Sequence, residues 1–323
     1  MKKVLASLFA VGLLLGLGTS AQAAYPEQPI TMYCAWGAGG GTDACARIIA
    51  TLMQKDLGVP VNVVNLTGGS GAPGHQAMIA PSAKPDGYTI GLGTVELSMM
   101  HWMGIAQFTA KDFAPIAGVN FDPAGITVGF NAPWKDYKEL EAHIKANPGK
   151  LQNSGTGVGG IWHLAQGAWL TTIGLPADAI KWIPSQGAAP ALQDLAAGGI
   201  DMTTCSLPEA ASMIESKKAR PLAIMAEKRD PKFPDTPTLK ELGINAPVIG
   251  AWRGVVGPHG MPKEVVAKLE AAVAKAVASK EFIDFMDSKG LGIQSMSAKD
   301  FGEFMVKADE ANGKILKAVG LAK

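Results

Sequence analysis

The chain has 323 residues, and its 29 basic and 28 acidic side chains give a formal net charge of +1 at pH 7. This balance argues against a nucleic acid as partner, because binding to nucleic acid requires a basic surface. The length exceeds one typical hydrophobic core and therefore predicts two domains.

Residues 1–23 have the pattern of a secretory signal peptide. Lys2 and Lys3 precede an apolar run over residues 4–17, and Ala21-Gln22-Ala23 supplies the small-x-small cleavage pattern. A membrane anchor is the weaker alternative, because the run is shorter than the roughly 20 residues that span a bilayer. We expect cleavage near Ala23 and export of the protein.

Short β-rich runs alternate with helical patterns after this segment. The first predicted strands are residues 30–35, 61–65 and 88–92. The helices expected between them are residues 45–57 and a segment that starts at His75. Strand–helix–strand alternation predicts an α/β fold, with a parallel sheet and helices on both of its faces.

The same alternation restarts after residue 124. The predicted strands are residues 125–130, 200–204 and 220–226, and the predicted helices are residues 134–147, 189–197 and 208–216. Residues 228–238 are rich in proline and charge and predict a surface loop. From Pro262 onward the chain is expected to be helical, with Val265, Leu269, Val273 and Val277 on one buried stripe.

Three glycine-rich loops precede expected helices, at residues 37–43, 68–75 and 154–163. A helix that starts after such a loop exposes free backbone N–H groups, and the helix dipole adds partial positive charge there. Such a loop can hold a carboxylate, phosphate or sulfate without a lysine. Glycines also make simple tight turns, but three loops at the carboxyl ends of strands favour an anion site.

Motifs for catalysis and cofactors are incomplete. Thr42 stands where a dinucleotide fingerprint has its third glycine, and Asn65 stands where it has an acid. Neither Ser70 nor Ser154 lies in a Gly-x-Ser-x-Gly elbow, and the five histidines form no metalloenzyme pair. We therefore expect no cofactor, no metal and no enzymatic activity.

Three cysteines, Cys34, Cys45 and Cys205, allow at most one disulfide. Small buried thiols are the favoured alternative, because a chain of this size does not need a disulfide for stability.

Six segments of the chain follow one another as in a known family. They are YPEQPITMYCAWGAGGGTDACARIIA (25–50), KPDGYTIGLGT (84–94), ANPGKLQNSGTGVGGIWHLA (146–165), GAAPALQDLAAGGIDM (187–202), RDPKFPDTPTLKELG (229–243) and WRGVVGPHGMPKEVV (252–266). With them, nearly all of the mature chain resembles the periplasmic solute-binding proteins of tripartite tricarboxylate transporters, the TctC-like or Bug family.

This resemblance implies a two-domain periplasmic-binding-protein fold of the type II, or Venus flytrap, kind, with the ligand cleft between the lobes. Domain 1 is expected to take residues 24–124 and 251–323, and domain 2 residues 125–250. The chain should cross between them near residues 120–126 and 247–252, where the lobes can close on a solute. The family's ligands are mostly small carboxylates, delivered to membrane permease subunits, and we expect a monomer.

The ligand-binding residues are expected in the first and third glycine loops and at three further places. They are Trp36, Gly39, Gly40, Thr42, Asp43, Glu96, Ser154, Gly155, Thr156, Gly157, Gly160, Trp162, His163, Cys205 and Trp252. Among these residues, Asp43 is also expected to cap the first helix. His163 has a packing role or a helix-start role as its plainer alternative.

Four of these residues depart from the family's usual pattern: Trp36, Glu96, Trp162 and Cys205. Flat indole rings would narrow the cleft, although interior packing is an equally weighted alternative for each tryptophan. Glu96 would disfavour a second ligand carboxylate and accept a hydroxyl or amine. The hypothesis is a ligand with one carboxylate and an apolar, hydroxylated or amino-bearing far end.

The competing interpretation is a two-domain α/β enzyme that acts on a small organic acid in the same cleft. A sensory or scaffold protein with this fold is a third possibility, because fold does not fix function.

Overall fold

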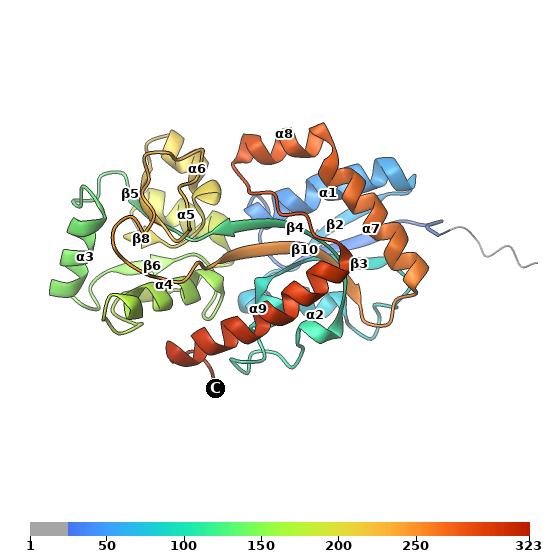
Figure 1. Cartoon of the computed structure of the whole chain (residues 1–323), viewed down its shortest axis with the longest axis horizontal. Helices are drawn as coiled ribbons and strands as arrows, with labels where there is room; N and C mark the ends of the chain where they lie inside the picture. Colours follow the sequence, from blue (N-terminus) through green and yellow to red (C-terminus); the bar gives the residue numbers. More distant parts are fainter. Residues whose placement is uncertain (1–24) are drawn as a thin grey trace, which may run out of the picture.

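The structure is a computed structural model that describes residues 25–323, so the predicted signal peptide lies outside the described residues. Two five-stranded sheets form two lobes that lie side by side (Figure 1). The sheet of lobe 1 has the strand order β2-β1-β3-β10-β4, and the sheet of lobe 2 has the order β7-β6-β8-β5-β9.

Lobe 1 is built from both ends of the described chain. Its strands are β1 (Ile30–Cys34), β2 (Val61–Asn65), β3 (Thr89–Thr94), β4 (Phe113–Pro123) and β10 (Gly250–Pro258). Its α-helices are α1 (Gly41–Leu57), α2 (Ala72–Met78), α7 (Lys263–Ala278), α8 (Lys280–Lys289) and α9 (Ala298–Ala318). Short 3₁₀ turns lie at Gly69–Gly71 (η1), Val95–Ser98 (η2) and Ala110–Asp112 (η3).

Lobe 2 is continuous in sequence. Its strands are β5 (Gly125–Gly129), β6 (Gln152–Ser154), β7 (Lys181–Ile183), β8 (Met202–Thr203) and β9 (Ala219–Ile224). Its helices are α3 (Tyr137–Ala146), α4 (Ile161–Thr172), α5 (Ala188–Ala197) and α6 (Leu207–Glu215).

Both sheets are mixed, so the expectation of a parallel sheet was wrong for part of each. β1 is parallel to β2 and β3, but β10 is antiparallel to β3 and β4. In lobe 2, β6 is parallel to β7 and β8, whereas β5 is antiparallel to β8 and β9. The physical reason is the long return of the chain from lobe 2, which brings β10 into lobe 1 from the opposite direction.

The two long strands β4 and β10 run through the middle of the molecule and connect the lobes (Figure 1). They pair along their length, from Gly250 opposite Pro123 to Pro258 opposite Phe113. The register shifts between Arg253 and Gly254, an irregularity of the kind that bends a strand and redirects a side chain. Every residue of β10 is buried.

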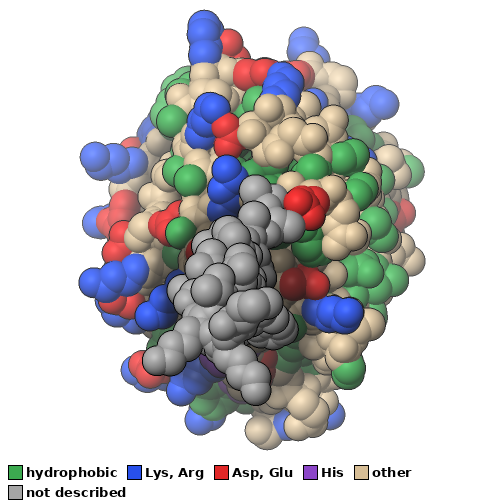
Figure 2. All heavy atoms as spheres, turned by 90° about the vertical axis from the view of Figure 1, so that its right-hand side faces the viewer, with side chains coloured by type: hydrophobic (Ala, Val, Ile, Leu, Met, Phe, Trp, Pro, Cys, Tyr) green, Lys and Arg blue, Asp and Glu red, His purple; other side chains and the backbone are tan. Residues whose placement is uncertain are grey.

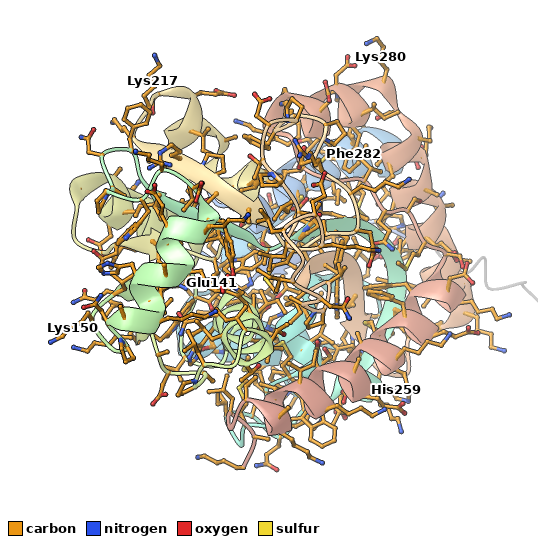
Figure 3. The ribbon with its side chains drawn as sticks, turned by 60° about the vertical axis from the view of Figure 1, so that its left-hand side comes forward. Glu141, Lys150, Lys217, His259, Lys280 and Phe282 are labelled. Carbon is orange, nitrogen blue, oxygen red and sulfur yellow. The ribbon has the colours of Figure 1, made fainter. Side chains whose placement is uncertain are left out.

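Helices cover both faces of the lobe 1 sheet. One buried apolar cluster contains residues of α1, α7 and α8, among them Ile49, Val273 and Phe282. Helix α8 has a polar outer face and an apolar inner face. In Figure 3, Lys280 projects outward and Phe282 lies on the inner side. The three cysteines are free, buried thiols, as the plainer alternative predicted.

The outer face of lobe 1 carries interspersed basic and acidic side chains, as Figure 2 shows. Within residues 25–323, no helix combines the length and the apolar character needed to cross a bilayer.

Candidate functional site

A narrow cavity lies between the lobes, where the N-termini of four helices meet. Its volume of about 20 Å³ has room for little more than one water molecule. The residues around it come from the start of α1, the end of β3, the starts of α4, α5 and α6, and β10. They are Trp36, Gly37, Gly40, Gly41, Thr42, Thr94, Glu96, Thr156, Ile161, Trp162, Gly187, Ala188, Ala189, Pro190, Glu209, Ala251 and Arg253.

Helix α1 reaches the cavity with its first backbone N–H groups free. It begins at Gly41, and its N-cap residue Gly40 has no side chain to cap it. The first helical hydrogen bond joins the Ala44 N–H to the Gly40 carbonyl. The N–H groups of Gly41, Thr42 and Asp43 therefore have no acceptor among residues 25–323, as expected for the first turn of an uncapped helix.

Asp43 fastens the glycine loop rather than capping α1, which corrects the expectation for its side chain. Its carboxylate accepts hydrogen bonds from the Gly39 N–H at 3.0 Å and from Asn65 at 2.9 Å. It also forms an ion pair with Arg47 at 2.9 Å. Burial alone would raise the pKa of Asp43, but these hydrogen bonds outweigh it and lower that pKa. The carboxylate thus stays charged and holds the loop in place.

Helix α5 of lobe 2 brings a second uncapped N-terminus to the same place. Its N-cap is Gly187, and the N–H groups of Ala188 and Ala189 have no acceptor within the described part of the chain. Gly187 packs across the cleft against lobe 1, since a Cβ on it would lie 3.6 Å from the Trp36 ring and 4.0 Å from the Gly37 nitrogen. The starts of α1 and α5 are therefore neighbours across the cleft.

Helix α4 receives a carboxylate from the opposite lobe. Glu96 accepts a hydrogen bond from the Ile161 N–H at 3.0 Å and another from the Thr94 hydroxyl at 2.5 Å. The indole N–H of Trp36 donates to the same Thr94 hydroxyl at 3.1 Å. Burial raises the pKa of Glu96. Thr156 also lines the cavity and is 3% exposed, and its hydroxyl has no partner in residues 25–323.

Arg253 is a buried cation at the crossing strands. Its guanidinium donates to the Thr42 hydroxyl at 2.9 Å, to Asn120, and to the carboxylate of Asp122 at 2.5 Å. It also pairs with Glu209 of lobe 2 at 2.9 Å. Burial alone would lower the pKa of Arg253, but the two carboxylates outweigh it and raise that pKa, whereas burial raises the pKa of Glu209. This ion pair joins the two lobes.

Six of the residues expected at the site line the cavity. They are Trp36, Gly40, Thr42, Glu96, Thr156 and Trp162. Gly39 lies next to them, in an outer groove of about 520 Å³ between α1, α6 and α8.

The other expected residues lie around the cavity without lining it, and their contact with ligand stays a prediction. Trp162 covers the Gly155 backbone, Gly157 packs against Ser70, and Gly160 packs against Thr156. In the same group, the Ser154 hydroxyl donates to the Ile183 carbonyl.

Three further expected residues are buried or packed within the protein, although the indole N–H of Trp252 has no partner in residues 25–323. His163 accepts from the Gly159 N–H at 3.0 Å and stacks on Trp182. Cys205 is fully buried, and Trp252 packs edge-on against Phe301 and Phe304.

Sequence reasoning missed the charged pair at the cavity, Glu209 and Arg253. Ser206-Leu207-Pro208-Glu209 is a capping-box pattern, in which the Ser206 hydroxyl caps α6. Arg253 stands alone as a charge within the buried strand Gly250–Pro258. A lone arginine in an apolar strand is a usable signal, because a buried charge needs a partner.

We predict an acid-sensitive stability from His75, which lies behind the cavity. Its Nδ1 is 2.9 Å from the Gly71 carbonyl and its Nε2 accepts from the Thr94 N–H, so the buried ring is neutral. Burial lowers its pKa to about 4. The unfolded chain takes up this proton below its ordinary pKa near 6.5, so stability present above that pH falls as the pH drops towards 4.

The loss from His75 should reach about 3 kcal/mol, at 1.36 kcal/mol per pKa unit. Urea unfolding at pH 7 and at pH 4.5 measures it, and His75→Gln should lose less stability between these pH values than the parent. Equal losses in parent and variant would contradict the assignment.

Within residues 25–323, no three His, Cys, Asp or Glu side chains are grouped so as to hold a metal ion.

Known proteins resemble this chain in sequence and in overall fold. The family described as "Tripartite tricarboxylate transporter family receptor" matches residues 45–321. The periplasmic binding protein BugD is 29% identical, with a TM-score of 0.86 over 93% of this chain and 100% of its own. MatC from Rhodopseudomonas palustris with bound malate is 25% identical, with a TM-score of 0.84 over 90% of this chain and 100% of its own.

A second R. palustris protein, with adipate, is 26% identical, with a TM-score of 0.86 over 92% of this chain and 99% of its own. These neighbours confirm the two-lobed periplasmic-binding-protein fold that the sequence predicted.

Proposed function

We propose that this chain, which belongs to the tripartite tricarboxylate transporter receptor family, is a periplasmic receptor that binds a small organic carboxylate between its lobes. The observation that carries the proposal is the pair of uncapped helix starts, α1 and α5, whose free N–H groups meet at one cavity. Amide donors at a helix N-terminus, together with the helix dipole, favour an anion.

Entry of such a ligand requires the lobes to separate. A cavity of about 20 Å³ is too small for even a short carboxylate. Opening would bend the crossing strands β4 and β10, as in other hinged receptors. We retain the boundaries 24–124 with 251–323 and 125–250 as the two moving units.

Export and transport complete the proposal. A signal peptide cleaved near Ala23 would deliver the chain to the periplasm as a monomer, where it passes the acid to the membrane permease subunits of a tripartite transporter. Malate and adipate, named with two of the related structures, are carboxylates of the expected size.

The test is to identify the acid that the purified protein carries, by mass spectrometry, and then to titrate it. A carboxylate that binds only the folded state should raise the stability by about 2.7 kcal/mol at 100 times its Kd. The ligand should be recovered unchanged after incubation. The receptor hypothesis fails if no carboxylate raises the melting temperature, and a chemically converted ligand would favour the enzyme alternative.

A further inference from the structure

Glu96 places a carboxylate of the protein itself at one of the helix starts that could hold a ligand. It belongs to η2 in lobe 1, yet it accepts the Ile161 N–H of α4 in lobe 2. The side chain is 1% exposed, and its second oxygen is held by the Thr94 hydroxyl. The first N–H of α4 is thus occupied from across the cleft, whereas the N–H groups of Trp162 and His163 have no acceptor within residues 25–323.

The guanidinium of Arg253 likewise has hydrogen-bond partners within the protein. Nε donates to Thr42, one terminal nitrogen donates to Asn120 and Asp122, and the other pairs with Glu209. Four of its five N–H donors are thus used, and a ligand carboxylate could reach only the second N–H of the nitrogen that pairs with Glu209. Displacing Glu209 would leave a buried acid without its cation, which is unfavourable.

The remaining backbone donors at the cavity lie at three helix starts. They are the free N–H groups at the starts of α1 and α5, which are neighbours across the cleft, and the Trp162 N–H of α4, which lies beside the Glu96 carboxylate. Beside them, Thr156 also lines the cavity, and its buried hydroxyl has no partner in residues 25–323. Such a buried hydroxyl needs a hydrogen-bond partner, and a polar group on a ligand can supply one.

We propose that Glu96 determines specificity because its carboxylate already occupies the place beside α4 that a second ligand carboxylate would need. The ligand then carries only one carboxylate, which binds at the starts of α1 and α5. This inference rests on the proposed receptor function and narrows its ligand class. A second ligand carboxylate would meet the Glu96 carboxylate in a buried site, where like charges repel strongly. Trp36, Trp162 and Ile161 offer an apolar surface to the far end of the ligand, and Thr156 offers a hydroxyl.

Calorimetry with matched acids tests the proposal. Hexanoate against adipate, lactate against malate, and benzoate against terephthalate differ chiefly in one carboxylate. The parent should bind the monocarboxylate of at least one pair at least about tenfold more tightly than its partner. Glu96→Ala frees the Ile161 N–H and should reverse that preference.

Glu96→Gln provides an intermediate case that keeps the fold. Its amide oxygen can still accept from Ile161, so the site stays filled while the charge is lost, and its preference should lie between those of the parent and Glu96→Ala. Glu227→Ala is the matched control, because this exposed acid pairs with Lys240 and with no other residue in 25–323, and its loss should leave the preference unchanged.

The outcomes separate the two proposals. If the parent binds no acid of any pair, the monocarboxylate assignment is overturned, and the acid carried by the purified protein tests the receptor function separately. If the parent binds dicarboxylates at least as tightly as monocarboxylates, or if Glu96→Ala leaves the ratio unchanged, the role of Glu96 is wrong and the receptor function stands.

Discussion

Replacing Arg253 with leucine should lower the free energy of unfolding by about 3–5 kcal/mol, the cost of leaving a buried charge without its partner. The guanidinium, 1% exposed, neutralises Asp122 and Glu209 in the same buried space. Without it, the buried Glu209 carboxyl group must take up a proton in the folded state. The loss should therefore be largest near pH 7 and become smaller as the pH falls. Urea unfolding at several pH values measures both effects.

A triple variant provides the control for this prediction. Arg253→Leu combined with Asp122→Asn and Glu209→Gln removes all three charges together and should recover much of the lost stability. If the free energy of unfolding of the single Arg253→Leu variant lies within about 1 kcal/mol of the parent's, the ion pairs of Arg253 contribute little to stability.

Gly40→Val should weaken carboxylate binding by at least about 100-fold while the protein stays folded. Gly40 has an ordinary extended backbone, with φ −79° and ψ 170°. A Cβ there would meet only the Gly37 carbonyl, at 3.5 Å, which is normal contact. The rest of the valine would fill the space at the start of α1. Loss of two charge-assisted hydrogen bonds, each worth about 1.5–3 kcal/mol, gives this magnitude.

Calorimetry with the acid identified by mass spectrometry measures this effect. Gly129→Val is the matched control, because Gly129 lies in lobe 2 away from the cleft and a Cβ there meets nothing within 4 Å. Unchanged binding by Gly40→Val would show that the loop before α1 is not part of the anion site.

Local patterns in the sequence were enough to predict much of the secondary structure. β2 was expected at residues 61–65 and has those bounds, and α1 ends at Leu57 as expected. The helix begins at Gly41 instead of residue 45, because Gly41 and Thr42 add no apolar periodicity although they adopt helical backbone. β4 was missed, since its prolines and glycine weaken a strand pattern that pairing with β10 overrides.

The cavity itself was only partly predictable. Glycine loops indicate free N–H groups from local sequence alone, and the three loops do open helices, α1, α2 and α4. The contacts that fill the cleft join residues far apart in sequence, such as Glu96 with Ile161 and Glu209 with Arg253. No periodicity or motif in one sequence encodes such pairs, because the topology of two lobes creates them.

The position of β10 has a consequence for how the chain folds. This strand lies between β3 and β4, yet more than a hundred residues of lobe 2 separate it from β4 in sequence. The lobe 1 sheet therefore cannot be completed until nearly four-fifths of the chain is available, whereas lobe 2 is continuous. Closing such a long loop is entropically costly and slow. Lobe 2 should consequently form first, with β10 joining the two halves of lobe 1 as the late, rate-limiting step.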